Sequence, residues 1–349
     1  MAEEVTSIRL GCTTSPGSGH EPDVERLLEK AGCEAVMLSG DPLQHLLNGE
    51  VDALVMDAQM QDLPVGVRSI GALPRQDPSL VLVCSDKPSH LVRGARIVVD
   101  HEPTRRQLVR FRSDLVLTTT DNLMHVPLQE DRTSKLLEAI GSGQIDGFVT
   151  SRSEHRRSGT RLRRHSLTMQ RGAPERSHFV PPTHSGTRLI IMREGENMGS
   201  LEPFIDEPST FAHEQEQWIH RHLPEGIRPL VSVNVDHRKI GGVLRELNLE
   251  GMSHFVDEAR FQAGFRSHEA PGGRRIREER PNAASVDRFR GPRAVMRLEL
   301  VSADGRFTAG AECICPLEDV DQERWRLIEE WGATLNALDA RQPSPQWDE

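Results

Sequence analysis

Cysteine and histidine are the first side chains in this sequence whose types and spacing could do chemistry. Cys313 and Cys315 are two residues apart, so on a strand they face the same side of a sheet. They could bind a metal or carry a covalent group, but no second ligand pair is evident, and we interpret them as half-buried structural cysteines. His213, His220 and His222 lack the i, i+4 spacing of a zinc-binding helix, and we interpret them as the polar face of a helix. We therefore expect no metal site.

A second group of candidates combines one carboxylate with arginines and a serine. Asp62 follows a strand pattern in an Asp-Leu-Pro turn, where an aspartate can also cap backbone amides. Arg105 and Arg106 follow another strand pattern. Ligands of open α/β sheets bind beyond such strand ends, often between domains. We expect one shared cleft for a small carboxylate ligand, formed by Asp62, Arg105, Arg106 and Arg157, with Ser15 at its rim.

The alternative for these arginines is structural. Exposed arginines usually pair with nearby acids, and Glu102 and Asp121 are the obvious partners in this stretch of the chain.

Composition excludes some classes of protein. The 349 residues carry a net charge of −10, which disfavours a general nucleic-acid binder. No apolar run approaches the roughly 18 residues that span a bilayer, and the opening MAEEVTS lacks the apolar stretch of a signal peptide. Five scattered cysteines argue against a disulfide framework. We expect a cytoplasmic protein with neither a nucleic-acid nor a membrane partner and of unknown oligomeric state.

The elements that must position the candidates alternate between strand and helix patterns. Short apolar runs between turns predict strands, and amphipathic periods predict the helices that separate them. The predicted strands of the first 200 residues are 7–10, 35–38, 53–56, 80–84, 95–99, 114–118, 145–150 and 187–192. This alternation is typical of an α/β sheet. The segments LLNGEVDALV and LLEAIGSGQIDGFV echo each other loosely, which fits two related lobes or ordinary helix-to-strand turns.

We divide the chain into two lobes and a third domain. Residues 1–90 and 187–207 form lobe 1, residues 91–186 form lobe 2, and residues 208–349 form the third domain. The strand at 187–192 is expected to return to the first sheet, so that the crossings at 85–94 and 184–186 act as hinges. The third domain is predicted to contain a hairpin at 294–315, a helix at 319–338 and an arginine-rich loop at 266–293 without packed structure.

The order of these motifs resembles the porphobilinogen deaminase (hydroxymethylbilane synthase) family. Residues 58–64 stand where the family has His-Ser-x-Lys-Asp-x-Pro, and the aspartate and proline are kept. The matches elsewhere are Gly11, Ser15, Pro16, Leu46, Leu47, Gly49, Asp52, Arg105, Arg106 and Arg157. The resemblance implies two lobes of the periplasmic-binding-protein type plus a small α+β third domain. It also implies that Asp62 is the catalytic carboxylate and that the arginines hold acetate and propionate groups.

The sequence departs from that family where the cofactor is attached. The family carries dipyrromethane on a Gly-Gly-Cys turn, but the matching segment LPEGIRP at 223–229 has no cysteine. Isoleucine or glycine cannot supply thiolate chemistry. Gln61 replaces the family's lysine, and a mobile loop is missing after Gly40. We therefore expect no bound cofactor.

Three functional hypotheses follow. The first is a divergent family member linked to tetrapyrrole (porphyrin or haem) biosynthesis, a pseudoenzyme that binds an anionic pyrrole or another small carboxylate between its lobes. The second is an active hydroxymethylbilane synthase, a transferase that polymerises porphobilinogen with a non-standard cofactor attachment. The third is a non-catalytic scaffold partner of another enzyme.

Overall fold

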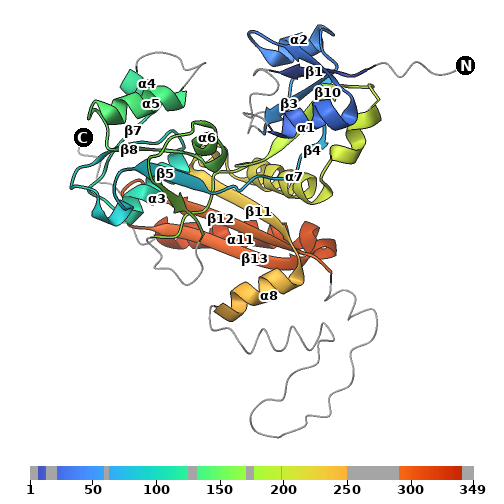
Figure 1. Ribbon diagram of the computed structural model, residues 1–349. Coiled ribbons are helices and arrows are strands. Elements are labelled where there is room, and N and C mark those ends of the chain that lie inside the picture. The colour runs from blue at the N-terminus through green and yellow to red at the C-terminus, as the bar shows by residue number, and fades with distance from the viewer. Residues whose placement is uncertain are drawn as a thin grey trace, which may run out of the picture.

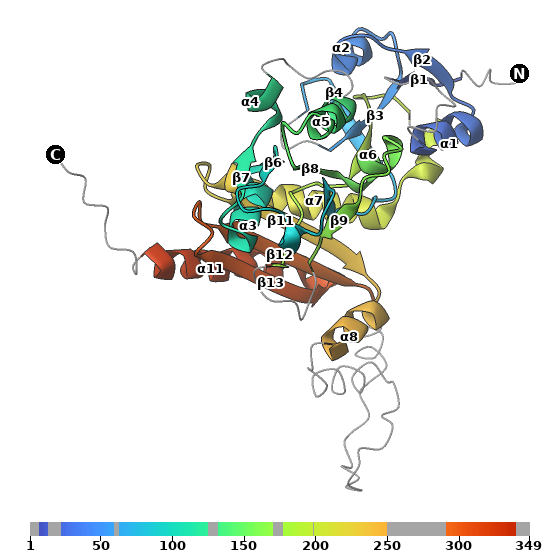
Figure 2. The same cartoon turned by 60° about the vertical axis from the view of Figure 1, so that its left-hand side comes forward.

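The computed structural model describes residues 7–12, 22–58, 63–124, 132–169, 177–197, 199–249 and 291–339. Within them, two five-stranded sheets and one three-stranded sheet form two α/β lobes and a third domain (Figure 1). In both ribbon views the third sheet lies below lobe 2 (Figure 2). The expected α/β class, with two lobes and a small additional domain, is confirmed.

Lobe 1 is a mixed sheet covered on both faces. Its strands lie in the order β2-β1-β3-β10-β4, with β10 antiparallel to both neighbours. The strands are β1 (Arg9–Cys12), β2 (Glu34–Met37), β3 (Ala53–Asp57), β4 (Val67–Ala72) and β10 (Arg188–Arg193). Helix α1 (Pro22–Ala31) and the 3-10 segment η3 (Gly199–Phe204) bury Leu27 and Leu201 on one face, and α2 (Pro42–Leu47) buries Leu46 on the other.

Lobe 2 repeats this plan. Its order is β7-β6-β8-β5-β9, with β5 antiparallel to both neighbours. The strands are β5 (Leu80–Cys84), β6 (Arg96–Val98), β7 (Val116–Thr118), β8 (Gly147–Ser151) and β9 (Arg164–Leu167). Helix α3 (Glu102–Phe111) covers one face through Leu108, and α5 (Arg132–Gly141) covers the other through Leu136. The shorter elements are η1 (Pro88–His90), α4 (Thr120–Met124) and α6 (Arg152–Arg157).

The division between the lobes differs from the predicted one. As expected, β10 returns to the first sheet and pairs with β3 and β4. However, β5 pairs with β8 and β9, so it belongs to lobe 2 and not to lobe 1 as predicted. The first crossing from lobe 1 to lobe 2 therefore lies between Ala72 and Leu80, and not at 85–94. An apolar run predicts a strand, but its pairing partners are set by tertiary structure.

The third domain is a three-stranded antiparallel sheet with helices on one face. Its order is β11 (Val231–Arg238), β12 (Arg293–Val301), β13 (Thr308–Pro316), and the last two form the predicted hairpin. The helices and 3-10 segments are α7 (Glu207–His222), η4 (Arg228–Leu230), α8 (Ile240–Leu249), η5 (Leu317–Asp319) and α11 (Val320–Asp339). Residues 266–290 of the predicted loop lie outside the described residues.

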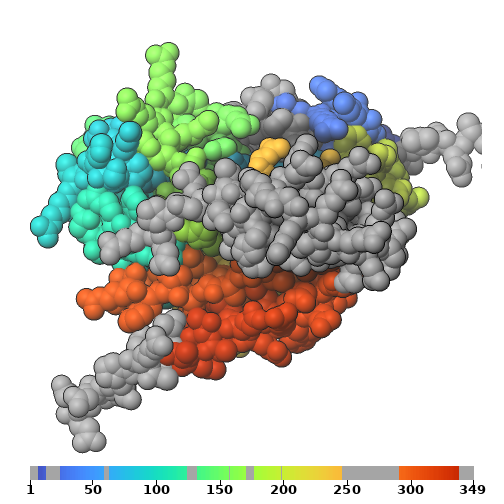
Figure 3. All heavy atoms as spheres, turned by 90° about the horizontal axis from the view of Figure 1, so that it is seen from below, coloured from blue at the N-terminus to red at the C-terminus, as the bar shows by residue number. Residues whose placement is uncertain are grey.

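The two faces of the third sheet differ in chemistry. Val233, Met296 and Leu298 face the helices α7 and α11 and form one apolar core with Ile219 and Trp331. The alternate residues of β11 and β12 are mostly polar, with Val295 and Val301 among them, and this face of the sheet points toward lobe 2, as the period of two requires. This polar face is nevertheless buried, because α3 packs on β12. In the space-filling view, the orange third domain lies directly against the cyan part of lobe 2 (Figure 3).

No helix of the described segments is both long and apolar enough to cross a membrane.

Candidate functional site

Only part of the predicted interlobe site lies among the described residues. Ser15 and Asp62 lie outside the described residues, and so does the side chain of Arg157, whose backbone ends α6. Their convergence on one cleft therefore stays a prediction. Arg105 and Arg106 are described, and they lie in the first half of α3.

The two arginines of α3 share a single carboxylate. Arg105 Nε and Nη2 donate to Glu102 at 2.5 and 2.8 Å, and Arg106 Nε donates to the same side chain at 2.8 Å. Arg106 Nη1 also donates to the carbonyl of Val301 in β12, at 3.1 Å. The hydrogen bond from Arg105 outweighs partial burial and holds the pKa of Glu102 below its usual value. The cluster carries two positive charges and one negative charge at the positive end of a helix, where an anion is stabilised.

The turn that follows α7 leads into η4, which packs against α3, the helix that carries both arginines. Arg228 donates through Nε to the carbonyl of Leu223 and through Nη2 to that of Arg221, each at 2.7 Å. These bonds satisfy carbonyls at the end of α7 that have no partner within the helix. The turn is thus held by arginine and carries Gly226 and Ile227, with no thiol.

The carboxyl ends of β6 and β7 hold a second charged cluster. Asp100 accepts from Thr120 N and Oγ1, both at 2.7 Å, and pairs with Arg132 at 2.5 Å. Burial raises the pKa of Asp100, but the Thr120 hydrogen bonds and the Arg132 charge outweigh it, so the pKa is lowered. This aspartate is therefore ionised, and Arg132 already balances its charge at this end of the sheet.

A buried polar cluster joins both crossing segments to the third domain. Glu216 of α7 is fully buried, and its Oε1 accepts from Arg75 Nη1 at 2.7 Å and from Val235 N at 2.9 Å. Its Oε2 accepts from His184 N at 2.8 Å. Burial raises the pKa of Glu216, but the charge of Arg75 and the bonds of His184 outweigh it, so the pKa is lowered. Arg75 comes from the first crossing and His184 from the second, so one carboxylate holds both.

The histidines of α7 differ from the predicted polar face. His213 and His220 are buried, while His222 is exposed and stacks on Trp218 with ring centroids 3.8 Å apart. His213 Nδ1 lies 3.2 Å from His184 Nδ1. Burial, then the charge of His184, lowers the pKa of His213 to about 4, so this ring is neutral at pH 7. The prediction was wrong because α7 is enclosed by lobe 1 and β11, which helical period alone does not indicate.

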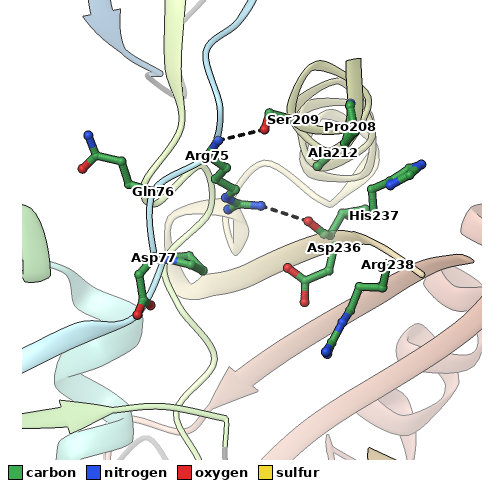
Figure 4. Close-up of a pocket in the computed structure, with 11 residues that line it drawn as sticks. Arg75, Gln76, Asp77, Pro208, Ser209, Ala212, Asp236, His237 and Arg238 are labelled. Carbon is green, nitrogen blue, oxygen red and sulfur yellow. Dashed lines mark hydrogen bonds between the residues drawn. The ribbon is translucent and has the colours of Figure 1, made fainter. Parts of the chain in front are cut away.

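Arg75, Asp77 and Pro78 line a pocket of about 350 Å³. The pocket lies between the first crossing, the first turn of α7 and the end of β11 (Figure 4). Its remaining walls are Gln76, Pro208, Ser209, Ala212, Val235, Asp236, His237 and Arg238. No local signal marks these residues, because three separate segments supply them.

The paired cysteines lie on the helix-covered face of the third sheet. Cys315 is buried in the apolar core, and Cys313 packs against the same core. The Cys313 thiol donates to Glu323 Oε2 at 3.6 Å, and the neighbouring Cys315 and burial raise its pKa. Both are therefore structural, half-buried or buried thiols. In the described part of the chain, no group of three metal-ligating side chains is close enough to hold a metal.

No protein-family model and no curated protein matches the chain. Among solved structures, a periplasmic substrate-binding protein of an ABC transporter from Coxiella burnetii is 15% identical, covering 60% of this chain and 96% of that one, with a TM-score of 0.35. A nutrient-binding protein from Burkholderia cenocepacia bound to methionine is 15% identical, with coverages of 53% and 84% and a TM-score of 0.32. The reduced regulatory domain of OxyR2 from Vibrio vulnificus is 13% identical, with coverages of 57% and 92% and a TM-score of 0.33. The strand orders of the chain itself define its two lobes.

Proposed function

We propose that this chain is a divergent member of the porphobilinogen deaminase family that binds a small carboxylate ligand between its lobes, without the family's covalent cofactor. The observation that supports this most directly is the proximity of η4 to α3. The resemblance implies that the cofactor turn and the arginine motif lie close together. Its support is that η4, at the end of the matching turn, contacts the helix that carries Arg105 and Arg106, over 100 residues away in sequence.

The charge at α3 supports an anionic ligand. Glu102 balances one of the two guanidinium groups, and the first turn of the helix adds a partial positive charge. A carboxylate placed there would form charge-assisted hydrogen bonds worth about 1.5–3 kcal/mol each. The ligand class that fits is a small acid such as an anionic pyrrole, which would link the protein to tetrapyrrole metabolism in the cytoplasm.

The positions of the thiols support the loss of the family reaction. The turn at 223–229 has no cysteine. Cys313 and Cys315 belong to the core under α11, whereas α3 packs on the opposite face of the same sheet through Glu299. A dipyrromethane attached to either thiol would have to displace that core. We therefore expect a pseudoenzyme. The two experiments below distinguish it from an active transferase and from a scaffold.

The intact mass of protein purified from cells that make porphobilinogen tests the absence of the cofactor. We expect the mass of the unmodified chain and no conversion of porphobilinogen to hydroxymethylbilane. An added mass equal to a dipyrromethane, or measurable turnover, would show that the chain is an active synthase.

Calorimetric titration with porphobilinogen tests the ligand site. Replacing Arg106 with alanine should weaken binding about 10- to 100-fold, the loss of one charge-assisted contact. Arg326→Ala is the matched control, because Arg326 also pairs with an acid four residues away on a helix, Glu330, but on the exposed side of α11. Circular dichroism checks that both variants fold. Absence of binding in the wild type would leave the scaffold hypothesis.

A further inference from the structure

Aromatic side chains of α7 and α11 meet at the surface of the third domain. The rings of Trp218 and His222 stack, with centroids 3.8 Å apart and planes 23° apart. The ring of Trp325 stands nearly perpendicular to both, with its centroid 4.7 Å from that of Trp218 and 4.9 Å from that of His222. We call these three residues the aromatic patch.

The patch is held in place by polar contacts. Arg324 Cζ lies 3.7 Å from the centroid of the Trp218 ring, and the guanidinium is itself fixed by Asp321 and by Gln215 Oε1, each at 2.8 Å. His222 Nδ1 lies 2.8 Å from the carbonyl oxygen of Trp218. Side chains that are already fixed lose little conformational entropy when a partner binds. The patch is therefore preorganised for contact.

Trp325 does not contribute to the interior of the domain. The described apolar core includes Trp218, Ile328 and Trp331 from the same two helices, but not Trp325, which is 49% exposed. Tryptophan and arginine are enriched among the few residues that carry most of the energy of a protein–protein interface. A half-exposed tryptophan that rests on fixed rings therefore has the character of a binding hot spot.

The surroundings of this ring are acidic. Residues 317–339, which form η5 and α11, contain seven acids and two arginines. Asp321 and Glu329 lie four residues before and four residues after Trp325, so on the helix they flank its ring, and both are exposed. The two arginines of this stretch already pair with acids of the same helix. Negative charge therefore exceeds positive charge around the exposed ring.

We propose that the aromatic patch is the docking site for a partner protein, which binds through a segment rich in arginine or lysine that also carries an apolar residue. A cation of that segment would lie over the exposed ring of Trp325, and the flanking acids would attract it. The same acids disfavour a second copy of this chain, which would bring like charges together, and an anionic membrane surface.

The patch is separate from the proposed interlobe site. Both α7 and α11 cover the apolar face of the third sheet, whereas α3, with its arginines, packs on the opposite face. A docked segment therefore leaves the α3 arginines free to hold a ligand.

Calorimetry on the full chain with defined peptides tests the docking. The probe is a short amphipathic peptide with leucines on one face and arginines on the other. Two further peptides replace every arginine with glutamate or every leucine with serine. We expect saturable binding of one arginine–leucine peptide per chain, weaker binding of the serine peptide and none of the glutamate peptide. The absence of saturable binding, or equal binding of the serine peptide, would overturn the proposal.

The variants locate the binding. Trp325→Ala should weaken the arginine–leucine peptide about tenfold or more, because it removes the exposed ring. Glu329→Lys should weaken it about threefold, because it reverses one flanking charge, and it serves alone if the first variant folds poorly by circular dichroism. The matched controls are Phe307→Ala, which removes a ring that is 41% exposed on the hairpin turn, and Glu194→Lys, which reverses an exposed charge on lobe 1.

Both controls should bind the peptide as the wild type does. Arg106→Ala should also bind it normally, which separates the patch from the interlobe site. Wild-type affinity in both Trp325→Ala and Glu329→Lys would contradict the assignment.

Two further measurements address the other occupants. Sedimentation velocity measures self-association, and flotation with phosphatidylcholine vesicles measures membrane binding. The wild type and Trp325→Ala should give the same sedimentation coefficient and the same vesicle-bound fraction. A dimer that is lost in Trp325→Ala would assign the patch to a second copy of the chain, and vesicle binding that is lost in the same variant would assign it to a membrane. Either result would overturn the proposal.

Discussion

The two lobes share one plan but are attached to the rest of the molecule by different chemistry. In lobe 1, Asp52 accepts from Arg9 N, and Arg9 Nη2 donates to Gly49 O. In lobe 2, Asp146 accepts from Arg96 N, and Arg96 Nη2 donates to Gly143 O. The same arginine, aspartate and glycine roles therefore recur at the starts of β1 and β6, beside the echoed segments in which β3 and β8 begin.

Lobe 2 is attached to the third domain through buried charges. Glu299 of β12 accepts from Gln107 Nε2 at 2.8 Å and pairs with Arg110 at 2.8 Å, and the two charged side chains are only 6% and 7% exposed. Lobe 1 is attached through hydroxyl groups of α7. Thr210 Oγ1 accepts from Ala72 N at 2.9 Å, and Ser209 Oγ accepts from Arg75 N at 2.8 Å.

This difference predicts which of the two lobes separates first from the third domain. A buried pair that loses one partner leaves an uncompensated charge, so its geometry is strongly specified. Neutral bonds contribute about 0.5–1.5 kcal/mol each and separate at lower cost. We expect lobe 2 and the third domain to behave as one unit and lobe 1 to open before it. Glu216, which holds both crossings, should matter to both lobes.

Replacing Glu216 with glutamine should have the largest effect. The variant leaves Arg75 buried without a counter-charge and should lower the free energy of unfolding by about 3–5 kcal/mol. Urea unfolding followed by circular dichroism measures it. Glu214→Gln, on the exposed side of the same helix, should stay within about 0.5 kcal/mol of wild type. Equal stability of the two variants would remove the central role of Glu216.

Replacing Glu299 with glutamine should selectively loosen lobe 2. We expect a loss of about 3 kcal/mol, because Arg110 keeps its bond to the carbonyl of His178 but loses its buried charge partner. Hydrogen exchange in α3 should rise while exchange in lobe 1 stays constant. Glu329→Gln, exposed on α11, is the control. Increased exchange in lobe 1 but not in α3 would reverse the comparison between the lobes.

Replacing Thr210 with valine should have a smaller effect, confined to lobe 1. The change keeps the shape but leaves Ala72 N–H without its acceptor, at a cost of about 1–2 kcal/mol. Exchange of the Ala72 amide should increase at least fivefold. Thr334→Val removes a hydroxyl from an exposed position on α11 and should be neutral. A cost above that of Glu299→Gln would mean that lobe 1 is the more firmly attached.

Replacing Asp52 with asparagine should have the smallest effect on the free energy of unfolding. That effect should depend on pH. The hydrogen bond from Arg9 lowers the pKa of Asp52 to about 2, below its value of 3.8 in the unfolded chain. Its contribution is therefore present above pH 4 and lost as the pH falls toward 2. Because Arg9 is 40% exposed, we expect only about 1 kcal/mol at pH 7. Asp146→Asn is the equivalent change in lobe 2. If the difference in unfolding free energy between Asp52→Asn and wild type stayed constant from pH 4 to 2, the assignment would be contradicted.

Local pattern was enough to predict most elements. The pattern of short apolar runs and amphipathic periods correctly predicted eight of the ten strands of the two lobes, as well as the hairpin and the final helix. It missed β4 and β9, whose burial patterns are interrupted by exposed or half-buried residues. The echoed segments correctly indicated two related lobes, because the same helix-to-strand turn performs the same task in each.

By itself, the sequence determined the strands, the helices, the two-lobe plan and the absence of a thiol at the turn. Each of these depends on residues that are close together in the chain. Tertiary structure alone decided that β5 joins lobe 2, that His213 is buried, and that Arg75 meets Glu216 across 141 positions of sequence. A buried charge must find a partner wherever the fold places one, and no periodicity along the chain records which distant segment provides it.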